Sequence, residues 1–221
     1  MFLILFLYST REIMIKNLLF DLGGVIMNIE KERCVASFER LGLEGARSYF
    51  GEFSQQGPFM RLEEGSMTVD EFHAALHPHM PATVTDEDID NAFCDFLIGI
   101  PKHRLEALRR LAERFDIYML SNTNPIMWHS KIRHEFEQEG LTREDYFKGI
   151  VTSFEAGALK PDARIFNYAA EHLGIKPEET LFIDDSQANL DAAAALGFKT
   201  ALAAPGTEFV NVIEAALAEE K

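Results

Sequence analysis

The chain has 221 residues, of which 47% are hydrophobic and 26% are charged, a composition that is ordinary for a soluble globular protein. This length suits one large domain, or a core domain with a smaller insert. The formal net charge of -15 excludes broad electrostatic binding to nucleic acid or to anionic membranes. The only cysteines, Cys34 and Cys94, are too few for a zinc site or a disulfide framework, which favours a reducing, cytoplasmic location.

The chain begins with an apolar run, residues 1–8. This run is shorter than the roughly 20 residues that span a bilayer. No basic residue precedes it and no small-residue cleavage site follows it, so the pattern does not predict a signal peptide. Met14 stands just before the first predicted core strand. We therefore expect residues 1–13 to be a dispensable extension, and a chain that begins at Met14 to fold and function.

The first predicted strand is the apolar run 18–20, which ends at Asp21 and is followed by Gly23 and Gly24. A run that is apolar at every position is typical of a strand buried on both faces. Open α/β sheets bind their ligands at the carboxyl ends of strands, which is where Asp21 lies. The glycines allow a sharp turn and a close approach to a ligand. Taken alone, this stretch is equally compatible with an ordinary turn.

Residues 28–100 show helical rather than strand periodicity and predict an all-helical insert. Three helices are expected, over residues 31–41, 68–76 and 85–98. The second and third open with capping-box patterns at Thr68 and Thr85. Because the insert follows the first strand directly, we expect it to cover the carboxyl end of that strand as a lid.

Strands and helices alternate after Pro101, beginning with a helix through Leu105. We expect strands over residues 115–120, 149–152, 180–183 and 199–203, and further helices over 161–173 and 188–196. This alternation predicts an α/β fold with a doubly wound parallel sheet. The expected domains are therefore a Rossmann-like core of residues 14–27 and 101–221, and a helical cap of residues 28–100.

Three more polar clusters occupy positions where a ligand is expected. Ser121 and Asn122 follow one strand, and Asp184 and Asp185 follow another. Lys160 precedes Pro161 at the start of a helix, where backbone N–H groups favour an anion. Each cluster alone is compatible with a turn, a helix cap or a solvated charge.

These clusters converge with Asp21 on one edge of the predicted sheet. Carboxylates gathered at one edge repel each other unless a cation lies between them. Mg²⁺ suits such carboxylate and carbonyl oxygens. The pattern therefore predicts a magnesium site at this edge.

The motifs Asp-x-Gly-Gly, Ser-Asn-Thr-Asn, Lys-Pro and Asp-Asp-x-x-x-Asn, in this order and with a helical insert, resemble those of the haloacid dehalogenase (HAD) superfamily. The resemblance extends from Ile15 to the C-terminus. Within the superfamily the chain is similar to the branch that contains the bacterial alpha-D-glucose-1-phosphate phosphatase. This resemblance implies a HAD-like Rossmannoid core with a C1-type cap, and Mg²⁺-dependent hydrolysis of a small phosphorylated metabolite through an aspartyl phosphate.

The resemblance also assigns roles to individual residues. It implies that Asp21 is the nucleophile and that Lys160 ties the nucleophile to the phosphate. Ser121 and Asn122 would hold the phosphoryl oxygens, and Gly24 would let the backbone approach the substrate.

The metal ligands follow from the same resemblance. They would be Asp21, Asp185 and the backbone carbonyl of Gly23, with Asp184 as a direct or water-bridged partner.

The chain departs from the family pattern at Gly23, because most phosphatases of the superfamily carry there a second Asp that acts as general acid. General acid catalysis is typically worth about 10²–10⁴-fold. Three explanations remain open. In the first, the lid supplies the acid from Glu63, Glu64 or His73. In the second, the substrate has a good leaving group that needs little protonation. In the third, the protein is weakly active and its main role is to bind its ligand. We favour a good leaving group, such as the anomeric oxygen of a sugar 1-phosphate.

Two alternatives to a phosphatase stay open. A 2-haloacid dehalogenase shares the fold and the nucleophile but needs no metal, so the predicted magnesium site disfavours it. A binding protein without activity has no need to keep the Asp21, Lys160 and Asp185 set together. The expected partner is a small phosphorylated metabolite, not nucleic acid or a membrane, and the expected state is a monomer or a small homo-oligomer.

Overall fold

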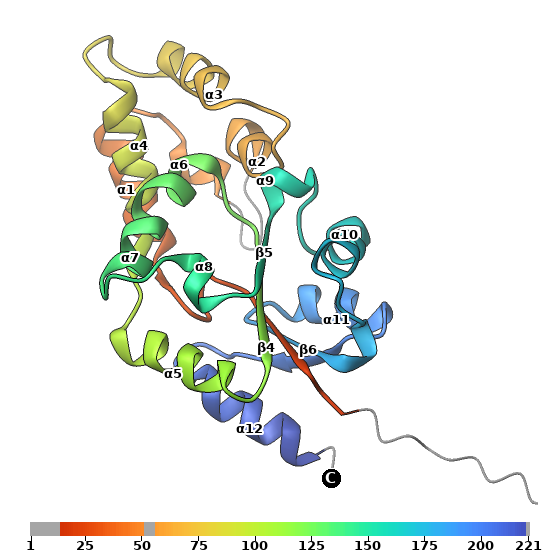
Figure 1. Ribbon diagram of the computed structural model, residues 1–221. Coiled ribbons are helices and arrows are strands. Elements are labelled where there is room, and N and C mark those ends of the chain that lie inside the picture. Colours follow the sequence, from red (N-terminus) through yellow and green to blue (C-terminus); the bar gives the residue numbers. More distant parts are fainter. Residues whose placement is uncertain (1–13, 51–55, 220–221) are drawn as a thin grey trace, which may run out of the picture.

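The computed structural model describes residues 14–50 and 56–219, so the predicted extension 1–13 lies outside the described residues. A five-stranded parallel sheet in the order β5-β4-β1-β6-β7 forms the centre of the fold (Figure 1). Its strands are β1 (Asn17–Phe20), β4 (Asp116–Ser121), β5 (Gly149–Thr152), β6 (Thr180–Asp184) and β7 (Lys199–Leu202). The predicted strands are thus confirmed, with ends that differ by one residue at most.

Helices cover both faces of the sheet, as predicted for a doubly wound fold. Alternate residues of β1 belong to two separate apolar clusters, with Leu18 and Phe20 in one and Leu19 in the other. The first cluster includes side chains of α5 (Lys102–Ala112) and α12 (Phe209–Glu219), and the second those of α10 (Ala163–Leu173) and α11 (Gln187–Ala195). Because β1 is buried on both faces, all of its positions are apolar except Asn17.

In the sheet, β1 lies between β4 on one side and β6 on the other. The chain adds β4 and β5 on the first side and then crosses β1 to add β6 and β7 on the second. Open α/β sheets bind their ligands at the carboxyl end of such a strand, where the strand order reverses. Asp21 follows β1 directly and therefore lies at that position. The location expected from the sequence is confirmed.

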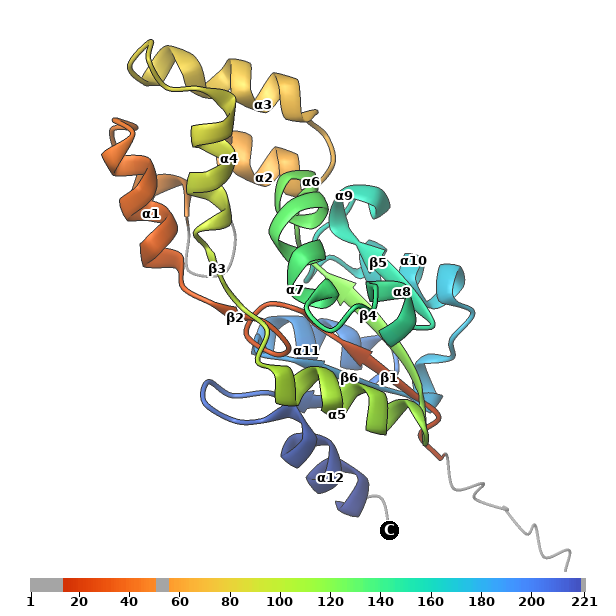
Figure 2. The same cartoon turned by 60° about the vertical axis from the view of Figure 1, so that its left-hand side comes forward.

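Four helices between β1 and α5 pack together beyond the carboxyl edge of the sheet, and we call them the cap (Figure 2). They are α1 (Lys31–Arg40), α2 (Gly57–Glu63), α3 (Val69–Leu76) and α4 (Asp86–Cys94). The capping boxes predicted at Thr68 and Thr85 are both present. The cap interior is aromatic: the ring of Phe59 lies 5.1 Å from those of Phe38, Phe72 and Phe93, between centroids.

The expectation that residues 28–100 contain no strand is wrong. The two segments that join the cap to the core pair with each other as antiparallel strands, β2 (Asn28–Ile29) and β3 (Leu97–Gly99). Strands this short carry no readable alternation, and part of the expected helix 85–98 is strand because α4 ends at Cys94. The cap is thus attached through a narrow two-stranded ribbon.

Both strands of this ribbon are anchored to the core. Arg104 at the start of α5 donates from Nη1 to the carbonyl of Ile26 (3.2 Å) and to Oδ1 of Asn28 (2.9 Å). On the returning strand, the N–H of Ile100 donates to Oε2 of Glu135 (2.8 Å). These bonds fix where the ribbon leaves the core, and they therefore help to position the cap relative to the sheet.

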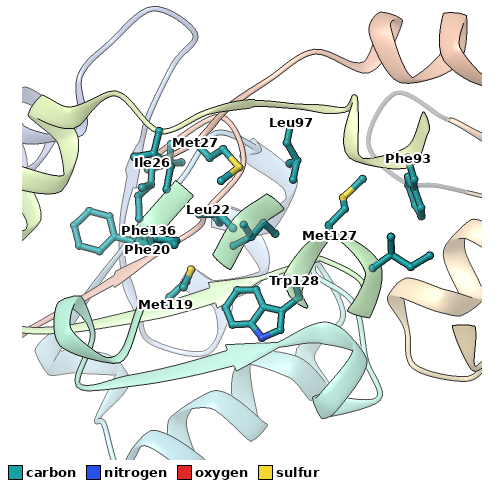
Figure 3. Close-up of a cluster of buried hydrophobic side chains, with 14 of the residues drawn as sticks. Phe20, Leu22, Ile26, Met27, Phe93, Leu97, Met119, Met127, Trp128 and Phe136 are labelled. Atoms are coloured by element: carbon teal, nitrogen blue, oxygen red, sulfur yellow. The ribbon is translucent and has the colours of Figure 1, made fainter. Parts of the chain in front are cut away.

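Glu135 belongs to a helical stretch that begins shortly after β4, at the carboxyl edge of the sheet. This stretch comprises α6 (Pro125–Met127), the π-helical turn η3 (Trp128–Ile132) and α7 (Arg133–Glu137). Figure 3 shows its side chains Met127, Trp128 and Phe136 together with Phe20 and Met119 of the sheet, Leu97 of β3 and Phe93 of cap helix α4. The remaining short helices are α8 (Arg143–Tyr146) and α9 (Ser153–Ala156). Among the described residues, no helix is long and apolar enough to cross a membrane.

Candidate active site

The carboxylate of Asp21 lies at the carboxyl end of β1 and is almost fully buried. Its backbone N–H donates to the carbonyl of Ile183 in β6 (2.9 Å), which continues the sheet ladder to this residue. Its Oδ1 lies 2.8 Å from Nζ of Lys160. Burial raises the pKa of Asp21 to about 7, because the loss of hydration and the neighbouring Asp184 and Asp185 together outweigh Lys160.

Lys160 joins two carboxylates in the interior. Its Nζ lies 2.8 Å from Oδ1 of Asp21 and 2.7 Å from Oδ2 of Asp184, and its side chain is 1% exposed. Burial works against the charge of the ammonium, but the two carboxylates overcome it and raise the pKa of Lys160. Lys160 therefore stays charged and holds Asp21 and Asp184 in one arrangement.

Asp184 is fully buried and already has hydrogen-bond donors at both oxygens. Its Oδ1 accepts from the N–H of Ser186 (2.8 Å) and from Nδ2 of Asn189 (3.0 Å), and its Oδ2 accepts from Lys160 (2.7 Å). The same amide of Asn189 also lies 3.1 Å from Oδ2. With these partners, Asp184 orients Lys160 and does not face an ion as a free carboxylate.

The oxygens of Asp21, Asp184 and Asp185 lie within 4.8 Å of one another, and these residues are the only such cluster in the described part of the chain. Burial and the charge of Asp184 raise the pKa of Asp185, and a cation bound beside it would favour its ionised form. A donor set made only of oxygens fits Mg²⁺. Because both oxygens of Asp184 already accept hydrogen bonds, Asp21 and Asp185 are the carboxylates of this cluster that fit the ion.

Gly24 differs from the expectation. Its N–H donates to the carbonyl of Met27 (2.9 Å), and this bond occupies the backbone donor that a substrate would need. The close approach at this position is to Asp185, whose Oδ2 would lie 2.0 Å from a β-carbon on Gly24. Gly24 therefore makes room for the predicted metal ligand and does not offer a contact to the substrate.

Ser121 and Asn122 lie at the carboxyl end of β4, on the same edge as Asp21. The hydroxyl of Ser121 is buried, and its one bond within the structure is a long contact to the carbonyl of Asn122 (3.3 Å). The side chain of Asn122 is already occupied, because it donates to the carbonyl of Lys160 (3.0 Å) and accepts from the N–H of Lys160 (2.9 Å). Asn122 thus ties the two loops together, and this pairing occupies its side-chain oxygen and one of the two N–H donors of Nδ2.

The three cap residues named as possible acids lie in different surroundings. His73 is buried within the cap, with Nε2 2.8 Å from Oδ1 of Asp90, so it belongs to the packing of α3 against α4. Glu64 is partly exposed and its Oε1 lies 4.0 Å from Arg164. Glu63 is different, because burial raises its pKa to about 8. A carboxyl group with this pKa holds a proton near neutral pH, as a general acid must.

Ser153 joins the cap to the site and was not among the residues expected there from the sequence. Its Oγ accepts from the N–H of Thr123 (3.0 Å) and lies 2.7 Å from the carbonyl of Glu63 at the end of α2. The available signal was the one that identified Ser121, a hydroxyl directly after a strand, here β5. Arg104 and Glu135 carry no such signal, because each reads as a charge on an amphipathic helix.

Comparison with known proteins places this geometry in a family. A family model described as haloacid dehalogenase-like hydrolase matches residues 15–197. The chain is 35% identical over 187 residues to D-ribitol-5-phosphate phosphatase of Bacteroides thetaiotaomicron, which covers 85% of this chain and 91% of the relative.

Solved structures agree. A HAD family enzyme of Bacteroides thetaiotaomicron in complex with magnesium and inorganic phosphate has a TM-score of 0.83 and 38% identity, covering 89% of this chain and 98% of that one. A HAD-like family hydrolase from Porphyromonas gingivalis has a TM-score of 0.85 and 31% identity, covering 92% and 98%. The chain therefore belongs to the haloacid dehalogenase-like hydrolases.

Proposed function

We propose that this protein is a Mg²⁺-dependent phosphatase that acts on a small phosphorylated sugar or sugar alcohol through an aspartyl phosphate at Asp21. One observation carries the proposal: Lys160 lies 2.8 Å from Asp21 and 2.7 Å from Asp184, beside Asp185, at the carboxyl end of β1. A structural relative that forms a complex with magnesium and inorganic phosphate supports a site for a metal ion and a phosphoryl group.

The chemistry needs a nucleophile that approaches an anion. An oxygen of Asp21 forms a bond to phosphorus while the bond from phosphorus to the leaving oxygen breaks, and the leaving oxygen takes a proton. Water then attacks the phosphorus of the aspartyl phosphate and releases inorganic phosphate, which restores Asp21. When it is bound, magnesium neutralises charge between nucleophile and substrate.

The residues around the nucleophile position Asp21 and bind the phosphoryl group. Lys160 holds Asp21 in place and adds positive charge beside the phosphoryl group. The hydroxyl of Ser121 and the backbone N–H of Asn122 are the donors we assign to the phosphoryl oxygens, because the side chain of Asn122 is engaged with Lys160. These groups are preorganised, so they need no rearrangement when charge develops.

The substrate class follows from the relative and from the missing acid. D-ribitol 5-phosphate, named for the relative at 35% identity, is an ester of an unactivated primary alcohol. A sugar 1-phosphate has a better leaving group. Its leaving oxygen therefore depends less on the general acid that is missing at position 23. Both are phosphates of small polyhydroxyl compounds, and a screen separates them.

The experiment is a hydrolysis screen in Mg²⁺ that covers ribitol 5-phosphate, sugar 5- and 6-phosphates, sugar 1-phosphates, acyl phosphates and an aryl phosphate. We expect phosphate release that EDTA abolishes and Mg²⁺ restores. Asp21→Asn should lower the rate by at least about 10³-fold, because it removes the nucleophile. Asp116→Asn is the control, since Asp116 is exposed at the start of β4 and pairs with Lys148.

Two outcomes would overturn the proposal. Full turnover by Asp21→Asn would remove the nucleophile assignment. Halide release from 2-haloacids without metal, in place of phosphate release, would establish the dehalogenase alternative.

A further inference from the structure

Ser153 is a fully buried residue at the start of α9, directly after β5. Its Oγ accepts a hydrogen bond from the backbone N–H of Thr123 (3.0 Å). Thr123 belongs to the loop of residues 121–124, which we call the phosphate loop because it carries Ser121 and Asn122, the residues that we assign to the phosphoryl oxygens. The hydroxyl of Ser153 therefore helps to fix the backbone of the phosphate loop.

The same hydroxyl has two acceptors within reach of its single proton. The carbonyl oxygen of Thr123 lies 3.0 Å from Oγ of Ser153, and the carbonyl oxygen of Glu63 in the cap lies 2.7 Å from it. A hydroxyl group has one proton to donate, so the two carbonyls compete for it. The shorter distance favours Glu63 in this structure, where the cap is in contact with the core.

The cap meets the core directly at this hydrogen bond. Glu63 is the last residue of α2, and the last carbonyls of a helix have no partner within the helix. Ser153 supplies a partner from the core. Two residues later, a β-carbon on Gly65 would stand 2.1 Å from the carbonyl oxygen of Phe154 in α9, so the two backbones are in close contact. Figure 1 shows α2 and α9 next to each other.

We propose that Ser153 is a positioning residue whose one hydroxyl couples the phosphate loop to the cap. The inference rests on the proposed phosphatase function and deepens it. While the cap is in contact with α9, the hydroxyl donates to Glu63 and accepts from Thr123. When the cap moves away, the hydroxyl turns to the carbonyl of Thr123, so no buried donor is left unpaired.

The coupling works in both directions. An anion bound at the phosphate loop orders Thr123 and, through it, the hydroxyl of Ser153. The cap then binds to a hydroxyl that is already ordered, which costs less conformational entropy. By linkage, a cap in contact with α9 strengthens the binding of the anion by the same factor.

Hydrogen exchange measures this coupling with a ligand that has no leaving group to extend toward the cap, namely inorganic phosphate with Mg²⁺. The reporters in the cap are the N–H groups of Glu64 and Ser66, which bond to carbonyls of α2. In the wild-type protein, phosphate should slow exchange at Asn122 and also, by about fivefold, at the two cap reporters, the size expected for one hydrogen bond. In Ser153→Ala, exchange at Asn122 should still respond to phosphate, whereas the cap reporters should not.

A second variant tests the same contact from the cap. Gly65→Ala places a β-carbon against the carbonyl of Phe154, which separates the cap from α9 and leaves Ser153 unchanged. It should give the same pattern of responses, and it keeps the test decisive if Ser153→Ala does not fold. Thr152→Val is the matched control, because it removes a neighbouring buried hydroxyl that pairs with Glu155. This control should respond as the wild-type protein does.

The other outcomes are distinct. An equal response of the cap reporters in wild type and Ser153→Ala would overturn the inference, as would a wild-type response confined to the phosphate loop. Loss of the cap response in Thr152→Val would also overturn it, because the loss of any buried hydroxyl would then be sufficient. Failure of the proposed function looks different: phosphate would leave exchange at Asn122 unchanged, and the wild-type protein would release no phosphate from any substrate of the screen.

Discussion

Gly24 lies directly against the carboxylate of Asp185: a β-carbon at position 24 would stand 2.0 Å from Oδ2 of Asp185. The backbone of Gly24 also has a φ of 76°, in the left-handed region that disfavours side chains. The neighbouring Gly23 has neither restriction, since a β-carbon there would meet Ile29 at 3.5 Å, an ordinary contact. The two glycines of the first motif therefore have different reasons to be glycine.

Substitution of the two glycines by alanine should give opposite results. Gly24→Ala should lower the free energy of unfolding by about 2 kcal/mol or more, since it adds strain in φ and displaces Asp185. Gly23→Ala should be neutral, or stabilising by up to about 1 kcal/mol. Urea unfolding of both variants measures the difference. Equal stability of the two would contradict the geometry at Gly24.

Gly23→Asp restores a carboxyl where most phosphatases of the superfamily have their general acid. The β-carbon fits beside Ile29, so the variant should fold. If protonation of the leaving oxygen limits the wild-type rate, kcat for an alkyl phosphate should rise, by up to about 10²-fold, and kcat for an aryl phosphate should rise less. Gly23→Asn has the same shape without the acid and is the control. Equal gains by both variants would exclude proton transfer as the cause.

Lys160→Met removes the cation between two buried carboxylates. The loss of one partner from a buried ion pair costs about 3–5 kcal/mol, so we expect a drop of about 3 kcal/mol at pH 8 in EDTA. The drop should shrink at lower pH, because the unpaired carboxyl group of Asp21, whose pKa is raised, then takes up a proton. Lys148→Met, which removes an exposed pair with Asp116, should cost about 1 kcal/mol or less. A loss that does not change with pH would argue against this explanation.

The two aspartates after β6 should respond differently to magnesium. Asp185→Asn removes a ligand, so the half-saturating Mg²⁺ concentration for phosphate release should rise at least about tenfold. Asp184→Asn should shift this concentration less and lower kcat instead, because Asp184 acts through Lys160. Mg²⁺ titrations at saturating substrate separate the two effects. A larger Mg²⁺ shift in Asp184→Asn would reverse the assignment.

Glu63 should make the protein less stable as the pH rises. Burial raises the pKa of Glu63 to about 8 in the folded protein, whereas the unfolded chain releases this proton near 4.5. Between these values the folded state binds the extra proton, so its contribution to stability is complete below pH about 4.5 and disappears as the pH passes about 8. The slope contribution is at most about 1.4 kcal/mol per pH unit.

The measurement is urea unfolding from pH 5 to 9 in EDTA. Glu63→Gln should flatten the decline, because glutamine has no proton to lose. Glu64→Gln, which changes the neighbouring glutamate in the same way, is the control. The same slope in all three proteins would show that Glu63 titrates normally.

The strand ends that hold the site were predictable from the sequence. The strands that precede Asp21 and Asp184 are buried on both faces, and such strands read as continuous apolar runs that stop where the polar site begins. Helix starts with a strong local signal, such as Thr68, were equally clear. In these cases the physical cause lies within a few residues of the chain, so the sequence carries it.

The side-chain partners across the site were not predictable. Asn122 is engaged by Lys160, which is far away in the sequence, and nothing local to Asn122 indicates this. The strands β2 and β3 are too short to show alternation and exist because each pairs with the other. The saturation of Asp184 likewise depends on Lys160 and Asn189 arriving from other elements.

The ribbon of β2 and β3 has a consequence for how such proteins diversify. Asp21, Lys160 and Asp184 all lie outside the segment between Asn28 and Gly99, and that segment enters and leaves the core through one adjacent pair of strands. If other helices replaced α1 to α4 on this pair of strands, Asp21, Lys160 and Asp184 would keep their places in the core. Exchange of residues 28–99 would therefore alter what faces the proposed substrate while the positions of Asp21, Lys160 and Asp184 stay the same.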